Sequence, residues 1–161
     1  MSYRRQARVS ENTWILVADR SKATIYESIW PALEYYRKVH EFKQSAGGEV
    51  SMRDRPGRMA GAGTMRPIGE PPTDFRHRSA QEVAMAAIDL LQQGRMNNQF
   101  GRLIIIAPAL LLGVLRDRLP APLAKMVVLT LRKHLVDVRV NELMEQVNDG
   151  LAMQDELAFA E

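Results

Sequence analysis

Cysteine is absent from this 161-residue chain, and long apolar runs are scarce. Without thiols the protein can form no disulfide, no zinc–thiolate or iron–sulfur centre and no cysteine nucleophile. The longest apolar run, residues 103–115, is interrupted by Pro108 and Gly113, whereas a membrane-spanning helix needs about 20 apolar residues. Residues 1–12 are basic but lack the long apolar stretch of a secretory signal. We therefore expect a cytoplasmic protein without a membrane span.

Lysine is also scarce, because arginine supplies 17 of the 22 basic residues. The guanidinium group presents a planar fork of donors that matches carboxylates and phosphates. The net charge is only +3, but residues 139–161 carry −5, which leaves +8 on residues 1–138. With 46% hydrophobic and 25% charged residues, the composition is typical of one globular domain. The excess of arginine points to an anionic partner without naming it.

Residues 13–43 have the pattern of β structure. Residues 14–18 form a continuous apolar run, which is typical of a central strand covered on both faces. A short polar turn leads to residues 23–27, and the short connection predicts a hairpin. After the break at Pro31, residues 35–42 alternate imperfectly and predict a third strand with one polar face.

Residues 44–78 contain six glycines and four prolines, too many for the interior of a helix or strand. They predict a long loop, which in a compact domain is usually functional or disordered. The motif DRPGR places a Pro56-Gly57 turn between Arg55 and Arg58. Such a turn would hold the two guanidinium groups in position to bind phosphate. The alternative is that Asp54 pairs with Arg58 across the turn. The candidate nucleic-acid-binding residues are the arginines of this stretch: Arg53, Arg55, Arg58, Arg66, Arg76 and Arg78.

Residues 79–161 alternate between helix and strand patterns. A capping box at Ser79 and Glu82 predicts a helix start, and Gly94 is placed to end that helix. The following elements are a strand over 102–107, a short helix over 110–115, a strand over 126–131 and a terminal helix in residues 139–161. The chain thus divides into a flexible basic N-terminus (1–12), one α/β domain (13–148) with the 44–78 loop, and an acidic C-terminal tail (149–161).

The element order β-β-β, loop, α-β-α-β-α predicts a mixed five-stranded sheet covered by helices, as in ribonuclease H-like folds. The acids at strand ends, Asp19 and Glu27, are too few for a two-metal site. Asp19 is better interpreted as a turn residue that accepts backbone N–H groups. The histidines show no ligand spacing, and no hydrolase, P-loop or dinucleotide motif occurs. We therefore expect no catalytic residue, metal or cofactor.

Four segments resemble the bacterial host attachment family, known as "protein required for attachment to host cells". They are residues 14–27 (WILVADRSKATIYE), 54–58 (DRPGR), 103–116 with its LGVLR ending, and 126–135 (MVVLTLRKHL). The resemblance extends over roughly residues 12–148. The sequence is also similar to the middle domain of archaeal and eukaryotic class I release factors. This similarity implies an element order of three strands, a long loop and a long helix, followed by strand, helix, strand and helix.

In those release factors a Gly-Gly-Gln tripeptide follows the third strand, whereas here Gly47 and Gly48 precede Glu49. A carboxylate lacks the amide donors of glutamine and brings negative charge to an RNA-rich site. The resemblance therefore implies a loop motif without peptide release. The other interpretation of the two glycines is a flexible turn after a strand.

Three hypotheses for function remain open. The first is a non-catalytic RNA- or ribosome-associated module that uses the arginine-rich loop. The second is a protein-binding regulatory factor in bacterial attachment, and the third is a release-factor-like peptidyl-tRNA hydrolase with Glu49 in place of glutamine. The oligomeric state cannot be inferred from the sequence.

Overall fold

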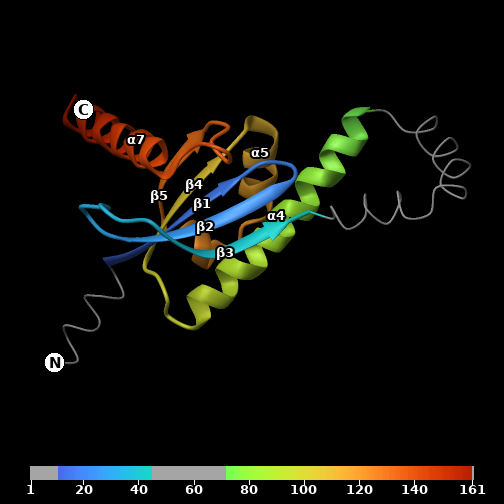
Figure 1. Ribbon diagram of the computed structural model, residues 1–161, viewed down its shortest axis with the longest axis horizontal. Coiled ribbons are helices and arrows are strands. Elements are labelled where there is room, and N and C mark those ends of the chain that lie inside the picture. Colours follow the sequence, from blue (N-terminus) through green and yellow to red (C-terminus); the bar gives the residue numbers. More distant parts are fainter. Residues whose placement is uncertain (1–10, 45–71, 161) are drawn as a thin grey trace, which may run out of the picture.

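The structure, a computed structural model, describes residues 11–44 and 72–160, with side chains over 11–44 and 76–154 (Figure 1). It is an α/β fold, as predicted. The elements are β1 (Asn12–Ala18), β2 (Lys22–Ile29), β3 (Arg37–Lys43), α4 (Pro72–Met96), β4 (Arg102–Ala107), α5 (Ala109–Arg118), α6 (Ala121–Ala124), β5 (Val127–Arg132) and α7 (Val140–Ala160).

The described strands form one five-stranded sheet in the order β3-β2-β1-β4-β5. Strands β1, β2 and β3 pair antiparallel, whereas β4 is parallel to both β1 and β5. This confirms the predicted mixed five-stranded sheet. The comparison with ribonuclease H-like folds stays a prediction.

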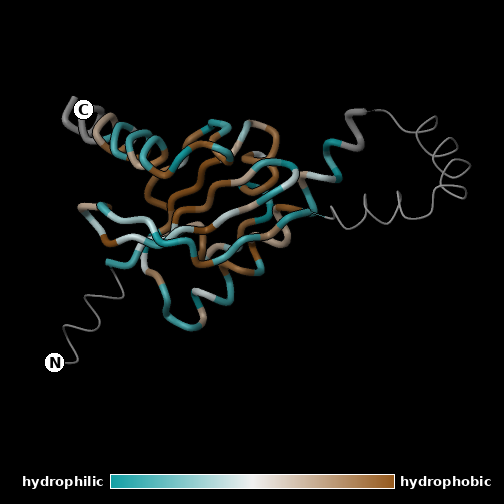
Figure 2. Tube along the Cα trace, in the orientation of Figure 1, coloured by the Kyte–Doolittle hydropathy of each residue, from teal (hydrophilic) through white to brown (hydrophobic). Residues whose placement is uncertain are grey.

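Strand β1 lies at the centre of the sheet, and its side chains alternate between two buried faces. Trp14 and Leu16 point to the face covered by α4 and α5, here called the α4 face. Ile15 and Val17 point to the other, the α7 face, where they share a core with residues of α7. All four are at most 1% exposed, which explains the uninterrupted apolar run. Figure 2 shows the hydrophobic colouring concentrated in these central strands.

Helix α4 begins at Pro72, seven residues before the predicted start at Ser79. The predicted start was wrong because Pro72 was interpreted as a loop residue, whereas proline is tolerated in the first helical turn. The predicted apolar stripe is confirmed, since Val83, Ala84 and Leu91 are fully buried against the sheet. The earlier start places the last part of the predicted 44–78 loop on a helix.

The predicted helix end at Gly94 was also wrong, because α4 continues to Met96. Asn98 adopts the left-handed conformation, with φ of 56°. Its N–H donates to the carbonyl of Arg95 at 3.0 Å, and the Gln99 N–H donates to that of Gly94 at 2.9 Å. These bonds form a Schellman motif with asparagine in the position usually held by glycine.

The C-terminal half follows the predicted order, with longer helices. Helix α5 covers three more residues after the predicted 110–115, and the short helix α6 was not predicted. Helix α7 continues to Ala160, so residues 149–160 of the predicted acidic tail lie on the predicted terminal helix. None of the helices described is both long and apolar enough to cross a membrane.

Candidate nucleic-acid interface

Side chains of helices α4 and α5 line a wide, open hollow of about 420 Å³, here called the arginine hollow. Three of its lining residues follow Arg78 on α4 at three, four and seven positions and therefore share one helix face with it, while Arg118 comes from the last turn of α5. The lining residues are Arg78, Gln81, Glu82, Met85 and Arg118. Two arginines from separate helices thus line one open surface hollow.

The packing of α5 against α4 positions Arg118. Leu111 and Leu115 of α5 are 1% exposed and belong to the same core as the buried stripe of α4. Arg118 lies at the exposed end of this helix, and its Nη1 approaches the Sδ of Met85 at 3.9 Å. Met85 is 46% exposed, so a polarizable thioether forms part of the open wall.

Gln44 connects the end of β3 to the arginine hollow. Its Nε2 donates a hydrogen bond to Oε2 of Glu82, and its backbone N–H donates to the carbonyl of Ser21 at 2.7 Å. Gln44, the last residue described before position 45, therefore lies beside the hollow. Pro72, where the description resumes, precedes Arg78 by six helical residues, or about 9 Å.

The structure describes two of the six predicted arginines, Arg76 and Arg78, and both are exposed on α4. Only Arg78 lines the hollow. The others, Arg53, Arg55, Arg58 and Arg66, lie outside the described residues. The same holds for the predicted loop motif, which comprises Gly47, Gly48, Glu49, Asp54, Pro56 and Gly57.

Sequence reasoning missed Arg118, Gln81 and Met85. Arg118 is distant in sequence from the other arginines, and only the packing of the two helices brings it to Arg78. Gln81 and Met85 follow Arg78 at three and seven residues, a spacing that would have placed them on one helix face had the helix been extended upstream of Ser79.

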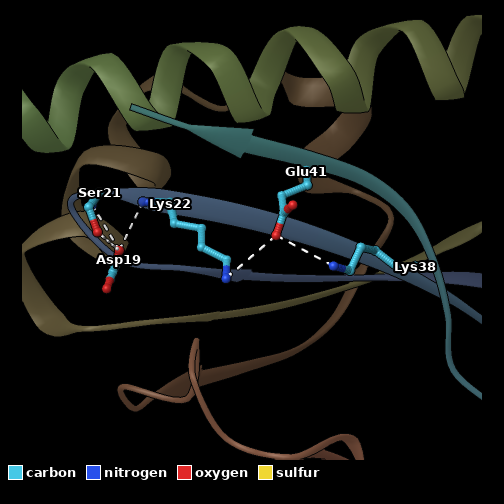
Figure 3. A network of polar contacts seen from close by, with 5 residues as sticks. All are labelled: Asp19, Ser21, Lys22, Lys38 and Glu41. Atoms are coloured by element: carbon cyan, nitrogen blue, oxygen red, sulfur yellow. Dashed lines mark hydrogen bonds and ion pairs between the residues drawn. The ribbon is translucent and has the colours of Figure 1, made fainter. Parts of the chain in front are cut away.

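A second polar cluster lies at the turn between β1 and β2 (Figure 3). Oδ1 of Asp19 accepts hydrogen bonds from the backbone N–H groups of Ser21 (2.8 Å) and Lys22 (2.9 Å) and from Ser21 Oγ (2.9 Å). Its Oδ2 lies 3.1 Å from Nε2 of His134, in the connection from β5 to α7. The predicted turn role of Asp19 is confirmed.

These contacts set the protonation of Asp19. Burial raises the pKa of the carboxyl, but the hydrogen bonds from Ser21, His134 and Lys22 outweigh it and hold the pKa below its ordinary value of 3.8. The carboxylate therefore acts as a clip that joins the β1–β2 turn to the β5–α7 connection. In the part of the chain that the structure describes, no three acidic or histidine side chains are grouped to hold a metal ion.

Glu41 of β3 lies between two lysines on the open part of the α7 face (Figure 3). Its Oε2 is 3.5 Å from Nζ of Lys22 and 3.5 Å from Nζ of Lys38. Desolvation raises the pKa of Glu41, but the two ammonium charges outweigh it and lower the pKa. Charged side chains on an edge strand discourage pairing with other chains, so we interpret this network as a protective surface.

We expect Asp19→Ala to lower the free energy of unfolding by about 1–2 kcal/mol at neutral pH, because charge-assisted hydrogen bonds in the turn are lost. The pKa of Asp19 is lower in the folded protein than in the unfolded chain. The stabilisation by Asp19 is therefore complete at a pH above its ordinary pKa, and it disappears as the pH falls through its pKa in the folded protein. Urea unfolding at neutral and acidic pH measures the difference. Asp137→Ala, which removes an exposed carboxylate nearby, should cost less than about 0.5 kcal/mol. A difference that persists at low pH would contradict the clip.

The fold and the site define an α/β protein with a mixed five-stranded sheet and an arginine-lined surface between two helices. Residues 14–147 match the profile of the family described as "Protein required for attachment to host cells", and the chain belongs to that family. This confirms the predicted family, while the similarity to release factors stays a prediction.

No curated protein matches this chain. A solved structure described as "Archaeal protein" is similar over 97% of this chain, with 15% sequence identity and a TM-score of 0.46. The chain spans 42% of the length of that structure, and a likeness this distant assigns no function.

Proposed function

We propose that this member of the host attachment family is a non-catalytic, cytoplasmic module that binds RNA, either free or within the ribosome. The observation that carries the proposal is the meeting of Arg78 and Arg118 in one hollow. Gln44 bonds to Glu82 of the hollow, Pro72 precedes Arg78 by six helical residues, and the sequence between Gln44 and Pro72 holds four more arginines. The arginines would then form one basic surface instead of being scattered.

The chemistry of this surface suits phosphate. Each guanidinium group donates several N–H bonds in a fixed plane and stays charged at all physiological pH values. RNA binding by such groups releases counterions, so the affinity falls steeply as the salt concentration rises. Glu82 lowers the local charge and argues for a site that recognises more than phosphate.

Replacing both Arg78 and Arg118 with glutamine should weaken binding to ribosomes or single-stranded RNA by about tenfold and reduce the salt slope by about one to two. The measurement is co-sedimentation with ribosomes and titration of RNA, each at low and high salt. Arg132→Gln with Lys133→Gln removes the same charge from exposed positions at the end of β5 and should change affinity less than twofold. Equal losses in both double variants, or no binding at low salt, would refute the proposal.

A protein-binding role is the second proposal, and the connection from β2 to β3 favours it. Ile29 is 53% exposed and Tyr35 is 83% exposed, and the Arg102 guanidinium lies 4.8 Å from the ring centroid of Trp30. Aromatic residues and arginine are common anchors of protein interfaces. Nuclease treatment separates the two proposals, because a protein partner survives it in a pull-down and an RNA-mediated partner does not.

A further inference from the structure

We infer that the arginine hollow receives an unstacked guanine base of single-stranded RNA. The inference rests on the proposed function and narrows it from RNA in general to one kind of strand and one base. It is carried by the juxtaposition of a carboxylate, an amide, two guanidinium groups and a thioether in one hollow.

Glu82 is the residue that phosphate binding alone leaves unexplained. A carboxylate accepts hydrogen bonds and donates none, and its negative charge repels a neighbouring phosphate. Guanine, however, presents two adjacent donors, N1–H and the N2 amino group, which fit the two oxygens of one carboxylate. Arg78 and Arg118 can then donate to O6 and N7, the acceptors that arginine commonly reads on guanine.

The other bases fit this arrangement poorly. Adenine places its N6 amino group beside the N1 acceptor, and cytosine places its N4 amino group beside the N3 acceptor, so each sets a lone pair against a carboxylate. Uracil has one N3–H between two carbonyl oxygens. Guanine alone offers the carboxylate two neighbouring donors on its Watson–Crick edge.

The surroundings of Glu82 support a base more than a duplex. The Nε2 of Gln44 donates to Oε2 of Glu82 and fixes the orientation of the carboxylate. Met85, whose Sδ lies 3.9 Å from Nη1 of Arg118, provides a polarizable wall for the base face. The hollow is open to solvent, so a base exposed on a single strand can reach its lining residues. In a duplex the Watson–Crick edge of guanine is already paired, so the strand must be single.

The experiment compares short oligouridine strands that carry one central guanine, inosine or adenine, titrated against the full chain. We expect the guanine strand to bind about tenfold more tightly than the adenine strand. Inosine lacks the N2 amino group and should bind with intermediate affinity. Guanosine monophosphate tests the free nucleotide as a source of the same base, and we expect it to bind far more weakly than the strand.

Glu82→Gln tests the recognition itself. It should weaken binding of the guanine strand by about fivefold or more, while the adenine strand binds equally or slightly better because a negative charge is gone. Asp89→Asn is the matched control, since it removes an exposed carboxylate from the same helix outside the hollow. It should leave the ratio between the two strands unchanged.

The outcomes separate the inference from the proposed function. If guanine and adenine strands bind equally, the inference is overturned while RNA binding stands. If guanosine monophosphate binds as tightly as the strand, the hollow is a nucleotide site and single-stranded RNA is rejected as its ligand. If no RNA or ribosome binds at all, the proposed function fails and the inference with it.

Discussion

Replacing Trp14 with alanine should lower the free energy of unfolding by about 4 kcal/mol, since truncations of buried tryptophan cost about 3–5 kcal/mol. Trp14 is 1% exposed in the central strand β1. Its ring stacks on Phe100 with centroids 4.5 Å apart and meets His40 edge-on at 5.3 Å. Its Nε1 also donates to Oε2 of Glu27 at 3.2 Å. Alanine removes all these contacts and leaves a cavity between the sheet and α4.

Urea unfolding followed by far-ultraviolet circular dichroism measures this effect without relying on tryptophan fluorescence. Trp14→Phe is the matched variant, because it keeps an aromatic ring against Phe100 but loses volume and the hydrogen bond to Glu27. It should cost about 1–2 kcal/mol. A loss below about 1.5 kcal/mol for Trp14→Ala would show that the surrounding helix collapses into the cavity.

Local sequence patterns were sufficient where an element is bounded by strong signals. Strand β4 has the predicted bounds, 102–107, because the apolar run 103–107 ends at Pro108. Strand β1 begins two residues before the predicted 14–18. That extension depends on pairing, since Asn12 lies opposite Ile29 of β2 and Thr13 opposite Ser28, and such partners cannot be read from a local window.

The ends of α4 were mispredicted for two physical reasons. Composition over a long window hid the fact that Pro72 suits a first helical turn. At the other end, Gly94 was interpreted as the residue that ends the helix. Its lack of a side chain instead leaves room for the ring of Trp14 to pack against α4. Glycine alone does not distinguish the two roles, because both a left-handed conformation and a close approach favour it.

The candidate site was predictable in part. The clustering of arginines directed attention to the region around Arg76 and Arg78, and Asp19 was correctly interpreted as a turn acceptor. The contribution of Arg118 could not be found, because it depends on how α5 packs against α4. The role of Glu82 was assigned to a capping box, and its place in the hollow became visible only on the longer helix.

Gly94→Ala should destabilise the protein by about 2 kcal/mol, although alanine at an ordinary helix position would stabilise it. A Cβ at residue 94 would lie 2.4 Å from Cη2 and 2.5 Å from Cζ3 of Trp14. The indole cannot move aside easily because it is held between Phe100 and His40. Overpacking of this kind costs about 1–3 kcal/mol or more, which exceeds the gain of about 1 kcal/mol in helix propensity.

Gly113→Ala should change the free energy of unfolding in the opposite direction, and urea unfolding measures both variants. Nothing lies within 4 Å of a Cβ at residue 113, and the position is exposed inside α5. The substitution should stabilise the protein by about 0.5–1 kcal/mol, because only the backbone entropy of the unfolded chain changes. In the Trp14→Phe background the cost of Gly94→Ala should fall below about 1 kcal/mol, since the clashing part of the indole is gone. An unchanged cost there would mean that Gly94 is required for a reason other than Trp14.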